Sequence, residues 1–168
     1  IACHIFDAAS LKFWLKSHVR NGLDFDIMAL SHYHAWHSLG DFKSWNDVVG
    51  YVKTTYNKEF LIMETAQLFR TGGNDAHVDI LGVDNIHALY VNSPTTNNQK
   101  KYMRDFGQEL YDAGGIGIIY WGGEWVGSKT LIFPDQYGAG SSWENKAFWD
   151  FNYNLHDGVN WMNEIVQK

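Results

Sequence analysis

The stretch Phe60-Leu61-Ile62-Met63-Glu64 decides the expected fold. Its four large apolar residues follow Asn57-Lys58 and precede polar Thr65, which predicts a short strand buried on both faces, as in a parallel sheet. Glu64 then leaves the sheet at the C-terminal end of this strand. Because the loops after parallel strands surround the active site in βα-folds, Glu64 is a candidate catalytic residue. The alternative is that Glu64 merely opens a surface loop.

Alternating strands and helices are expected along the whole chain. The expected strands are 1–6, 25–30, 60–63 and 116–120, the expected helices are 9–21, 45–56 and 98–112, and 143–149 and 158–166 are expected closing helical segments. Ser10 and Ser44 are the expected caps of the first two helices, and Asn21-Gly22 should end the first.

This alternation predicts right-handed βαβ units on a parallel sheet, within a single α/β domain that covers residues 1–168. Four such units form half of an eight-stranded barrel or a small open doubly wound sheet, and periodicity does not choose between them. Because the chain begins at Ile1 inside an expected strand, we expect that an N-terminal portion is missing.

Composition excludes several classes of function. A net charge of −6 with 13 scattered Lys and Arg argues against a nucleic-acid partner. No run approaches the roughly 20 apolar residues of a membrane span, so we expect no membrane partner. The single cysteine, Cys3, excludes an internal disulfide. Aromatic residues make up 16% of the chain, so we expect rings on loops or in a cleft, where they can stack on sugars.

Polar and aromatic clusters follow three of the expected strands. Together with the strands before them, these clusters form the segments Asp24-Phe25-Asp26-Ile27-Met28-Ala29-Leu30-Ser31-His32-Tyr33 with Trp36, Leu61-Ile62-Met63-Glu64-Thr65-Ala66, and Ile116-Gly117-Ile118-Ile119-Tyr120-Trp121 with Trp125. In this order they resemble the sixth, seventh and eighth strands of endo-β-1,4-galactanases, retaining glycosidases that degrade arabinogalactan. The resemblance implies that the chain is the fifth to eighth βα units of a (β/α)8 TIM barrel, a half barrel.

The resemblance also implies roles for particular residues. Glu64 matches the nucleophile, and Tyr33, or His32 beside it, would hydrogen-bond its carboxylate. The implied substrate-binding residues are His4, Trp36, Trp121 and Trp125, with Trp121 as the sugar platform.

A retaining glycosidase needs two carboxyl groups about 5 Å apart. The family's acid/base, a Glu preceded by Asn, would lie on the fourth strand of the barrel. The one Asn-Glu pair of this chain, Asn163-Glu164, falls instead in the terminal helical segment, where we expect a solvated face. The chain alone is therefore expected to be inactive.

The sequence contains two candidate metal sites. Asp75, His77 and Asp79 match the last three ligands of the family's calcium-binding Asp-x-Asp-x-His-x-Asn stretch, whereas Gly73 replaces the first Asp. Oxygen ligands at alternate positions suit Ca²⁺, and the alternative is a solvated loop. The tract that contains His32, His34 and His37 could bind zinc, although His32 has the better role beside Glu64. No cofactor is otherwise required.

We therefore expect part of a retaining glycoside hydrolase that acts on β-linked plant polysaccharide or oligosaccharide, β-1,4-galactan or arabinogalactan by resemblance. Its expected partner is the missing N-terminal half of the barrel or a second copy, and its expected location is secreted or periplasmic. Two alternatives stay open. The chain could be a non-catalytic carbohydrate-binding or assembly module, or an open doubly wound domain in which Glu64 is incidental.

Overall fold

The structure is a computed structural model that describes residues 1–75, 77–82, 94–127 and 140–166. The chain divides into two compact units, residues 1–65 with 106–120, and residues 66–105 with 121–168. Part of the loop expected at 71–96 lies outside the described residues.

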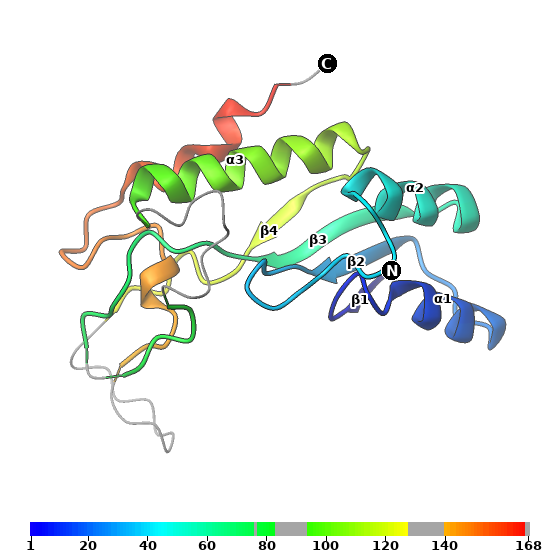
Figure 1. The fold of residues 1–168 in the computed structure, drawn as a ribbon, viewed down its shortest axis with the longest axis horizontal. Helices are drawn as coiled ribbons and strands as arrows, with labels where there is room; N and C mark the ends of the chain where they lie inside the picture. Colours follow the sequence, from blue (N-terminus) through cyan, green and yellow to red (C-terminus); the bar gives the residue numbers. More distant parts are fainter. Residues whose placement is uncertain (76, 83–93, 128–139, 167–168) are drawn as a thin grey trace. The chain divides into compact units, whose positions relative to one another are not determined.

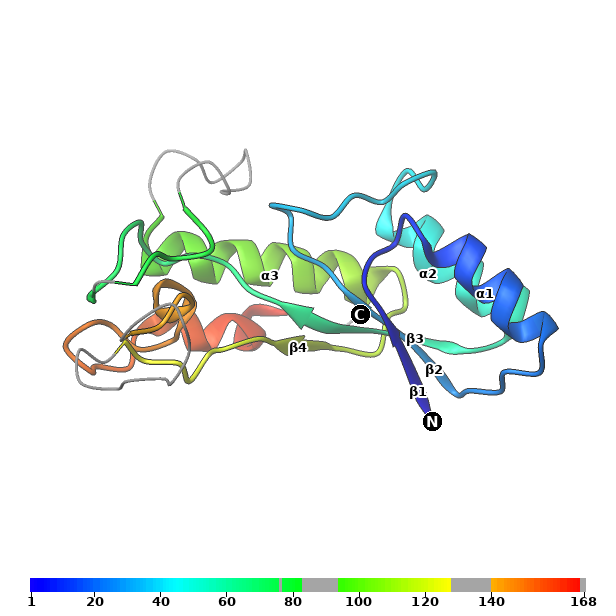
Figure 2. The same ribbon diagram turned by 90° about the horizontal axis from the view of Figure 1, so that it is seen from below.

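The first unit contains a parallel sheet, and helices connect its successive strands (Figure 1). Its strands are β1 (Ala2–Ile5), β2 (Ile27–Ser31), β3 (Glu59–Thr65) and β4 (Ile118–Tyr120), and its helices include α1 (Leu11–Arg20) and α2 (Trp45–Tyr56). Figure 2 shows α1 and α2 side by side. Helix α3 (Thr96–Asp112) precedes β4 and crosses the division between the units.

The strand order is β1-β2-β3-β4, with every neighbouring pair parallel. A doubly wound sheet instead reverses its strand order at a switch point. Consecutive strands that pair in chain order are the arrangement of a βα-barrel, so the fold is a partial α/β barrel, as predicted.

The helix ends follow local chemistry, with one correction. Ser44 caps α2, because its hydroxyl accepts a hydrogen bond from the Asp47 backbone N–H at 3.2 Å. Ser10 occupies the N-cap position of α1, as predicted, but its side chain makes no capping hydrogen bond to the described helix. Ser10 already has helical φ and ψ angles, and its hydroxyl donates to the Asp7 carboxylate at 2.8 Å. Gly22, with a φ of 89°, follows the end of α1 as expected.

Several element bounds also differ from the expectation. Strand β3 continues to Thr65 because backbone pairing extends beyond its apolar run, whereas β4 begins two residues later than expected, at Ile118. The closing segments contain the 3₁₀ helices η3 (Glu144–Lys146) and η4 (Asp157–Glu164). The expected helix at 143–149 is therefore a single short turn.

One face of the sheet packs against helices. Its fully buried strand residues include the register pairs Met28 with Phe60 and Leu30 with Ile62. The Trp45 ring of α2 lies 6.2 Å from the Phe60 ring. The opposite face carries the register row of His4, Ala29 and Leu61. In a barrel this opposite face is the interior.

The second unit contains the N-terminal part of α3, the segment after β3, and η3 and η4. The fully buried side chain of Gln99 joins two of these segments, because its amide donates to the backbone oxygens of Gln67 at 2.9 Å and Lys146 at 3.0 Å. Over the described residues, no helix has the length and apolar character that crossing a membrane requires.

Candidate active site

A bulge in β3 positions Glu64. Leu30 of β2 pairs with Ile62, but the next residue, Ser31, pairs with Glu64, so Met63 is an extra residue. The pairing with β4 shifts over the same residues of β3. In a regular strand Glu64 would share the face of Phe60 and Ile62, which packs against helices. The bulge instead gives Glu64 the face of Ser31, which is the interior face.

Tyr33 contacts the carboxylate that the bulge presents. Its hydroxyl donates to Glu64 Oε2 at 3.4 Å. Tyr33 is buried, and burial, followed by the negative charge of Glu64, raises the pKa of its phenol. The phenol therefore stays protonated at neutral pH and can donate to the carboxylate.

Ser31 and His37 lie close to this pair. The sequence did not predict either residue as part of the catalytic site. Ser31 Oγ lies 2.9 Å from His4 Nε2 on the neighbouring strand, which fixes the position of the exposed His4 ring. His37 Nδ1 lies 3.2 Å from the Tyr33 backbone nitrogen and 3.1 Å from the Ser31 backbone oxygen. Burial lowers the pKa of His37. The two backbone contacts of His37 stabilise the turn that carries Tyr33.

The ring of His32 is buried among core aromatic rings. It lies 4.7 Å from the Trp45 ring and 5.5 Å from the Phe106 ring, centroid to centroid. Its backbone N–H donates to the Glu64 backbone oxygen at 2.8 Å. The observed link between His32 and Glu64 is thus a main-chain hydrogen bond.

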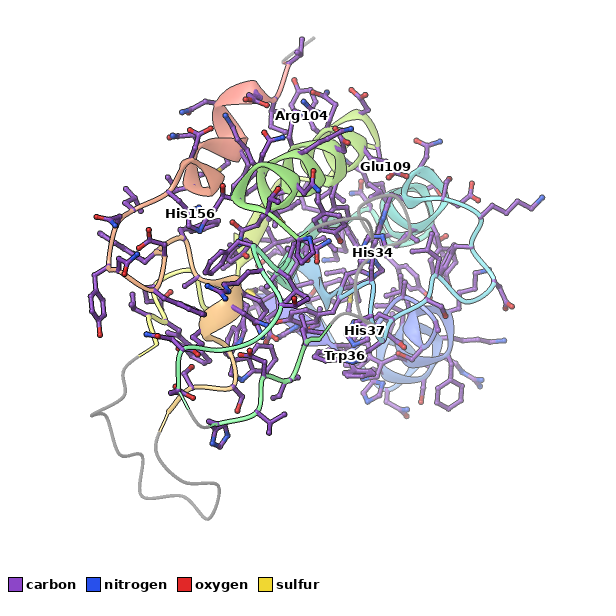
Figure 3. All side chains as sticks on the ribbon, turned by 60° about the vertical axis from the view of Figure 1, so that its left-hand side comes forward. His34, Trp36, His37, Arg104, Glu109 and His156 are labelled. Carbon is purple, nitrogen blue, oxygen red and sulfur yellow. The ribbon has the colours of Figure 1, made fainter. Side chains whose placement is uncertain are left out.

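The segment after β2 also carries His34, Trp36 and His37, which Figure 3 labels. Trp36 is 44% exposed, and its ring centroid lies 5.3 Å from that of Tyr33. An exposed indole beside a buried phenol offers a flat surface to a ligand.

The second unit holds a cluster of indoles. The Trp125 ring lies 5.5 Å from Trp121 and 6.3 Å from Trp143. Gly122 permits this packing, because it has a φ of 73° and a Cβ there would lie 3.3 Å from the Trp125 ring. Trp121 directly follows β4 in the chain, and Trp125 is 37% exposed.

The residues of the expected calcium stretch also lie in the second unit. Asp75 accepts hydrogen bonds from the backbone N–H groups of Ser141 at 2.8 Å and His77 at 2.7 Å. Burial, and then the charge of Glu144, raises the pKa of Asp79 to about 6. Glu144 is fully buried and accepts a hydrogen bond from the Asn74 backbone N–H.

A lysine accompanies these carboxylates. Lys146 is fully buried, and burial lowers its pKa to about 7, an effect that Asp79 partly offsets. Within the described part of the chain, no group of three or more His, Cys, Asp or Glu side chains is arranged to hold a metal ion, and this applies to the His32, His34 and His37 tract as well. The described residues, as placed, therefore do not fit a calcium centre.

Glu164 of the Asn-Glu pair forms ion pairs. Its carboxylate lies 2.6 Å from Lys100 Nζ and 3.5 Å from the Arg104 guanidinium. It joins η4 to α3 within the second unit, and its side chain is 39% exposed. This environment is that of a surface ion pair.

Comparison with known proteins places the chain in a family. The sequence profile of glycosyl hydrolase family 53 matches residues 1–162. The chain belongs to this family. It is 30% identical over 151 residues to an arabinogalactan endo-β-1,4-galactanase from Cellvibrio japonicus, and 26% identical over 162 residues to an endo-β-1,4-galactanase from Bacillus subtilis. These matches cover 89% and 79% of this chain.

Solved structures agree with the family 53 assignment. The catalytic domain of an Ignisphaera aggregans family 53 protein superposes with a TM-score of 0.75 at 26% identity, over 99% of this chain and 47% of that one. A structure of fungal β-1,4-galactanases superposes with a TM-score of 0.66 at 14% identity, over 98% of this chain and 48% of that one, and supports the fold.

The chain spans only part of these relatives. It covers 39% and 37% of the two curated galactanases and about half of the two solved chains. These matches show the family and the partial barrel fold of this chain. The activity and the substrate of the whole protein are proposals.

Proposed function

We propose that this chain belongs to a retaining glycoside hydrolase that cleaves β-1,4-galactan or arabinogalactan, with Glu64 as the nucleophile. One observation carries the proposal. The bulged end of β3 presents the Glu64 carboxylate on the interior face, where the Tyr33 hydroxyl donates to it at 3.4 Å. Its support is membership of family 53 and the galactanase names of two relatives.

The chemistry follows from one carboxylate held at the mouth of a barrel. Glu64 attacks the anomeric carbon and forms a glycosyl-enzyme ester while an acid protonates the leaving oxygen. Water then attacks the same carbon, activated by the same acid acting as a base, so the anomeric configuration is retained. Tyr33 orients the Glu64 carboxylate for attack. The acid/base is proposed to lie on a part of the barrel that is not in this chain.

Substrate binding is proposed for His4, Trp36, Trp121 and Trp125. Indole rings present broad, rigid faces that suit the apolar face of a pyranose. Trp36 and Trp125 are 44% and 37% exposed, so both are accessible to a ligand. Since a polysaccharide does not cross a membrane, we also propose that the protein acts outside the cytoplasm, secreted or in the periplasm.

Structural calcium is a separate proposal that rests on the family resemblance. Its support is the oxygen chemistry of Asp75 and Asp79, since carboxylates are hard ligands that suit Ca²⁺. Both oxygens of Asp79 are buried, and neither has a hydrogen-bond partner among the residues that the structure describes. The proposal requires the segment that contains Asp75, His77 and Asp79 to rearrange around the ion.

A non-catalytic sugar-binding module is the second candidate. The exposed indoles favour it, because they can hold a glycan whether or not Glu64 reacts. The two candidates differ in whether the glycan is cleaved.

The deciding experiment uses the full-length protein that contains this chain. It is incubated with β-1,4-galactan, and the anomeric protons of the newly released ends are followed by NMR. We expect hydrolysis in which the β-anomer appears first and then mutarotates. Binding without cleavage would favour the sugar-binding module, and an initial α-anomer would contradict the retaining mechanism.

A further inference from the structure

A pocket lies in the first unit, between α1 and α2. It has a volume of about 410 Å³ and is lined by residues that include Lys12, Asp41, Phe42, Asn46, Gly50 and Tyr51. Lys12 belongs to the first turn of α1, and Asn46, Gly50 and Tyr51 belong to α2. None of these side chains belongs to the proposed catalytic site.

Two half-buried aromatic rings form part of its wall. The centroids of Phe42 and Tyr51 lie 5.6 Å apart, with their planes inclined at 57°. The Tyr51 hydroxyl lies 3.3 Å from that of Tyr56, which fixes the ring on α2. Lys12 Nζ lies 4.3 Å from the Phe42 centroid and 5.9 Å from that of Tyr51. The wall is thus preformed, with the Lys12 ammonium group held over the Phe42 ring and, at a longer distance, over the Tyr51 ring.

Gly50 keeps this pocket open. It lies inside α2, where glycine is less favourable than alanine. Its φ is not positive, and a Cβ at this position would meet no atom of the described residues within 4 Å. Neither backbone strain nor close packing therefore requires a glycine here. Because Gly50 has no side chain, the space beside it in the pocket stays free.

The charges of the pocket favour an uncharged polar ligand. Two lysines and two aspartates line it, so their formal charges cancel. An anionic ligand would meet Asp41 and Asp47, and a cationic one would meet Lys12 and Lys43. Aromatic faces beside hydrogen-bonding groups of both kinds are the features that bind the apolar face and the hydroxyls of a sugar.

The position of the pocket suits a long glycan. In a βαβ unit the chain reverses between a strand and the next helix, so the N-terminal turns of α1 and α2 lie at the edge of the sheet where the strands end. Figure 1 shows this reversed direction for β3 and α2. Glu64 leaves the sheet at the same edge, on the interior face. The pocket lies among the helices that cover the other face.

We propose that this pocket is a secondary binding site for a neutral glycan chain, separate from the site of Glu64. The Phe42 and Tyr51 rings support a pyranose, and Asn46 and Asp41 hydrogen-bond its hydroxyls. The site holds a distant part of a polymer whose cleaved bond lies at Glu64. The choice of galactan as the glycan rests on the proposed function.

The test is native gel electrophoresis of the full-length protein in gels that contain soluble β-1,4-galactan. A Glu64→Gln background prevents cleavage of the polymer. Adding Gly50→Leu fills the pocket, and Tyr51→Ala removes part of its wall. We expect either change to weaken the retardation by galactan at least fivefold. Thr54→Leu places a leucine side chain one turn further along α2, outside the lining, and should leave the retardation unchanged.

Circular dichroism checks that each variant is folded, and Gly50→Leu provides the test if Tyr51→Ala does not fold. Retardation that stays within twofold of the Glu64→Gln parent in folded Gly50→Leu protein overturns the proposal. Absence of retardation in the parent overturns it as well. Galactan hydrolysis by the unmodified protein is measured separately, so failure of the secondary site is distinguished from failure of the proposed activity.

Discussion

Ser31 of β2 pairs with Glu64 of β3, although the preceding pair, Leu30 with Ile62, would place Met63 opposite Ser31 in a regular ladder. This one-residue shift decides which face of the sheet receives the carboxylate, because successive side chains of a strand point to opposite faces. The candidate site thus depends on a backbone irregularity as much as on the identity of Glu64.

Replacing Glu64 tests the nucleophile. In the full-length protein, Glu64→Gln should lower kcat on galactan by roughly a thousandfold or more, since an amide does not form the glycosyl-enzyme ester. Glu59→Gln is the matched control, at the exposed start of the same strand. Glu64→Gln activity within tenfold of the unmodified enzyme would exclude this role.

Removing the Tyr33 hydroxyl tests its positioning role. A hydrogen bond to a charged group contributes about 1.5–3 kcal/mol, so Tyr33→Phe should lower kcat by roughly 10- to 100-fold. KM should change little if the hydroxyl orients Glu64 without touching the sugar. Tyr153→Phe, which removes a hydroxyl from a residue that is 60% exposed, is the control. A change in KM with kcat intact would instead indicate a contact with the substrate.

Local patterns predicted the repeated βα units, because apolar runs, the Ser44 cap and Gly22 act through neighbouring residues. They did not predict the bulge at Met63. Strand register depends on β2 and β4, which are distant in sequence. The predicted bounds of β3 were wrong for the same reason, because backbone pairing continues beyond the apolar side chains.

The candidate site was predictable to different degrees. The motif around Tyr33 indicated a polar residue near Glu64, whereas the place of the His32 ring beside Trp45 and Phe106 depends on packing between separate elements. The burial of Glu144 and Lys146 was harder still to predict from the sequence. Charged residues are mostly exposed, and only the folded loops of the second unit explain why these two are fully buried.

The buried His37 should make the protein less stable in mild acid. Burial lowers its pKa below the ordinary value of 6.5, so the folded state binds a proton less readily than the unfolded state. Its contribution to the free energy of unfolding is therefore present above pH 6.5 and is lost as the pH falls through the folded pKa.

Urea unfolding of the full-length protein between pH 7.5 and 5 measures this effect, and His37→Asn should flatten the dependence on pH. His18→Asn, on α1, removes a second imidazole as the matched control. If His37→Asn left the slope as steep as before, the acid sensitivity would belong to other groups.

Chelation tests the calcium proposal through stability. If the segment with Asp75, His77 and Asp79 binds Ca²⁺, EDTA should lower the melting temperature of the full-length protein, and excess Ca²⁺ should restore it. By linkage, an ion present at a hundred times its Kd stabilises the folded state by about 2.7 kcal/mol. EDTA already saturated with Ca²⁺ is the control. Coincident melting curves with and without free chelator would contradict the site.

The isolated 168-residue chain should associate and lack activity. Within the described residues, β1 and β4 each pair with a single strand, so each leaves an edge of the sheet open. Ile116 and Ile119, before and within β4, are 51% and 48% exposed. Open edges and exposed apolar side chains favour association, so light scattering should show a dimer or larger species.

A charge at this surface should oppose the association. Ile119→Lys should shift the isolated chain toward monomer, whereas Val78→Lys, at a residue of the second unit that is 83% exposed, should not. None of these forms should release reducing ends from galactan, because Glu64 alone does not supply both carboxyl groups of a retaining mechanism. A stable monomer that hydrolyses galactan would show that the chain contains its own acid/base and needs no further part of a barrel.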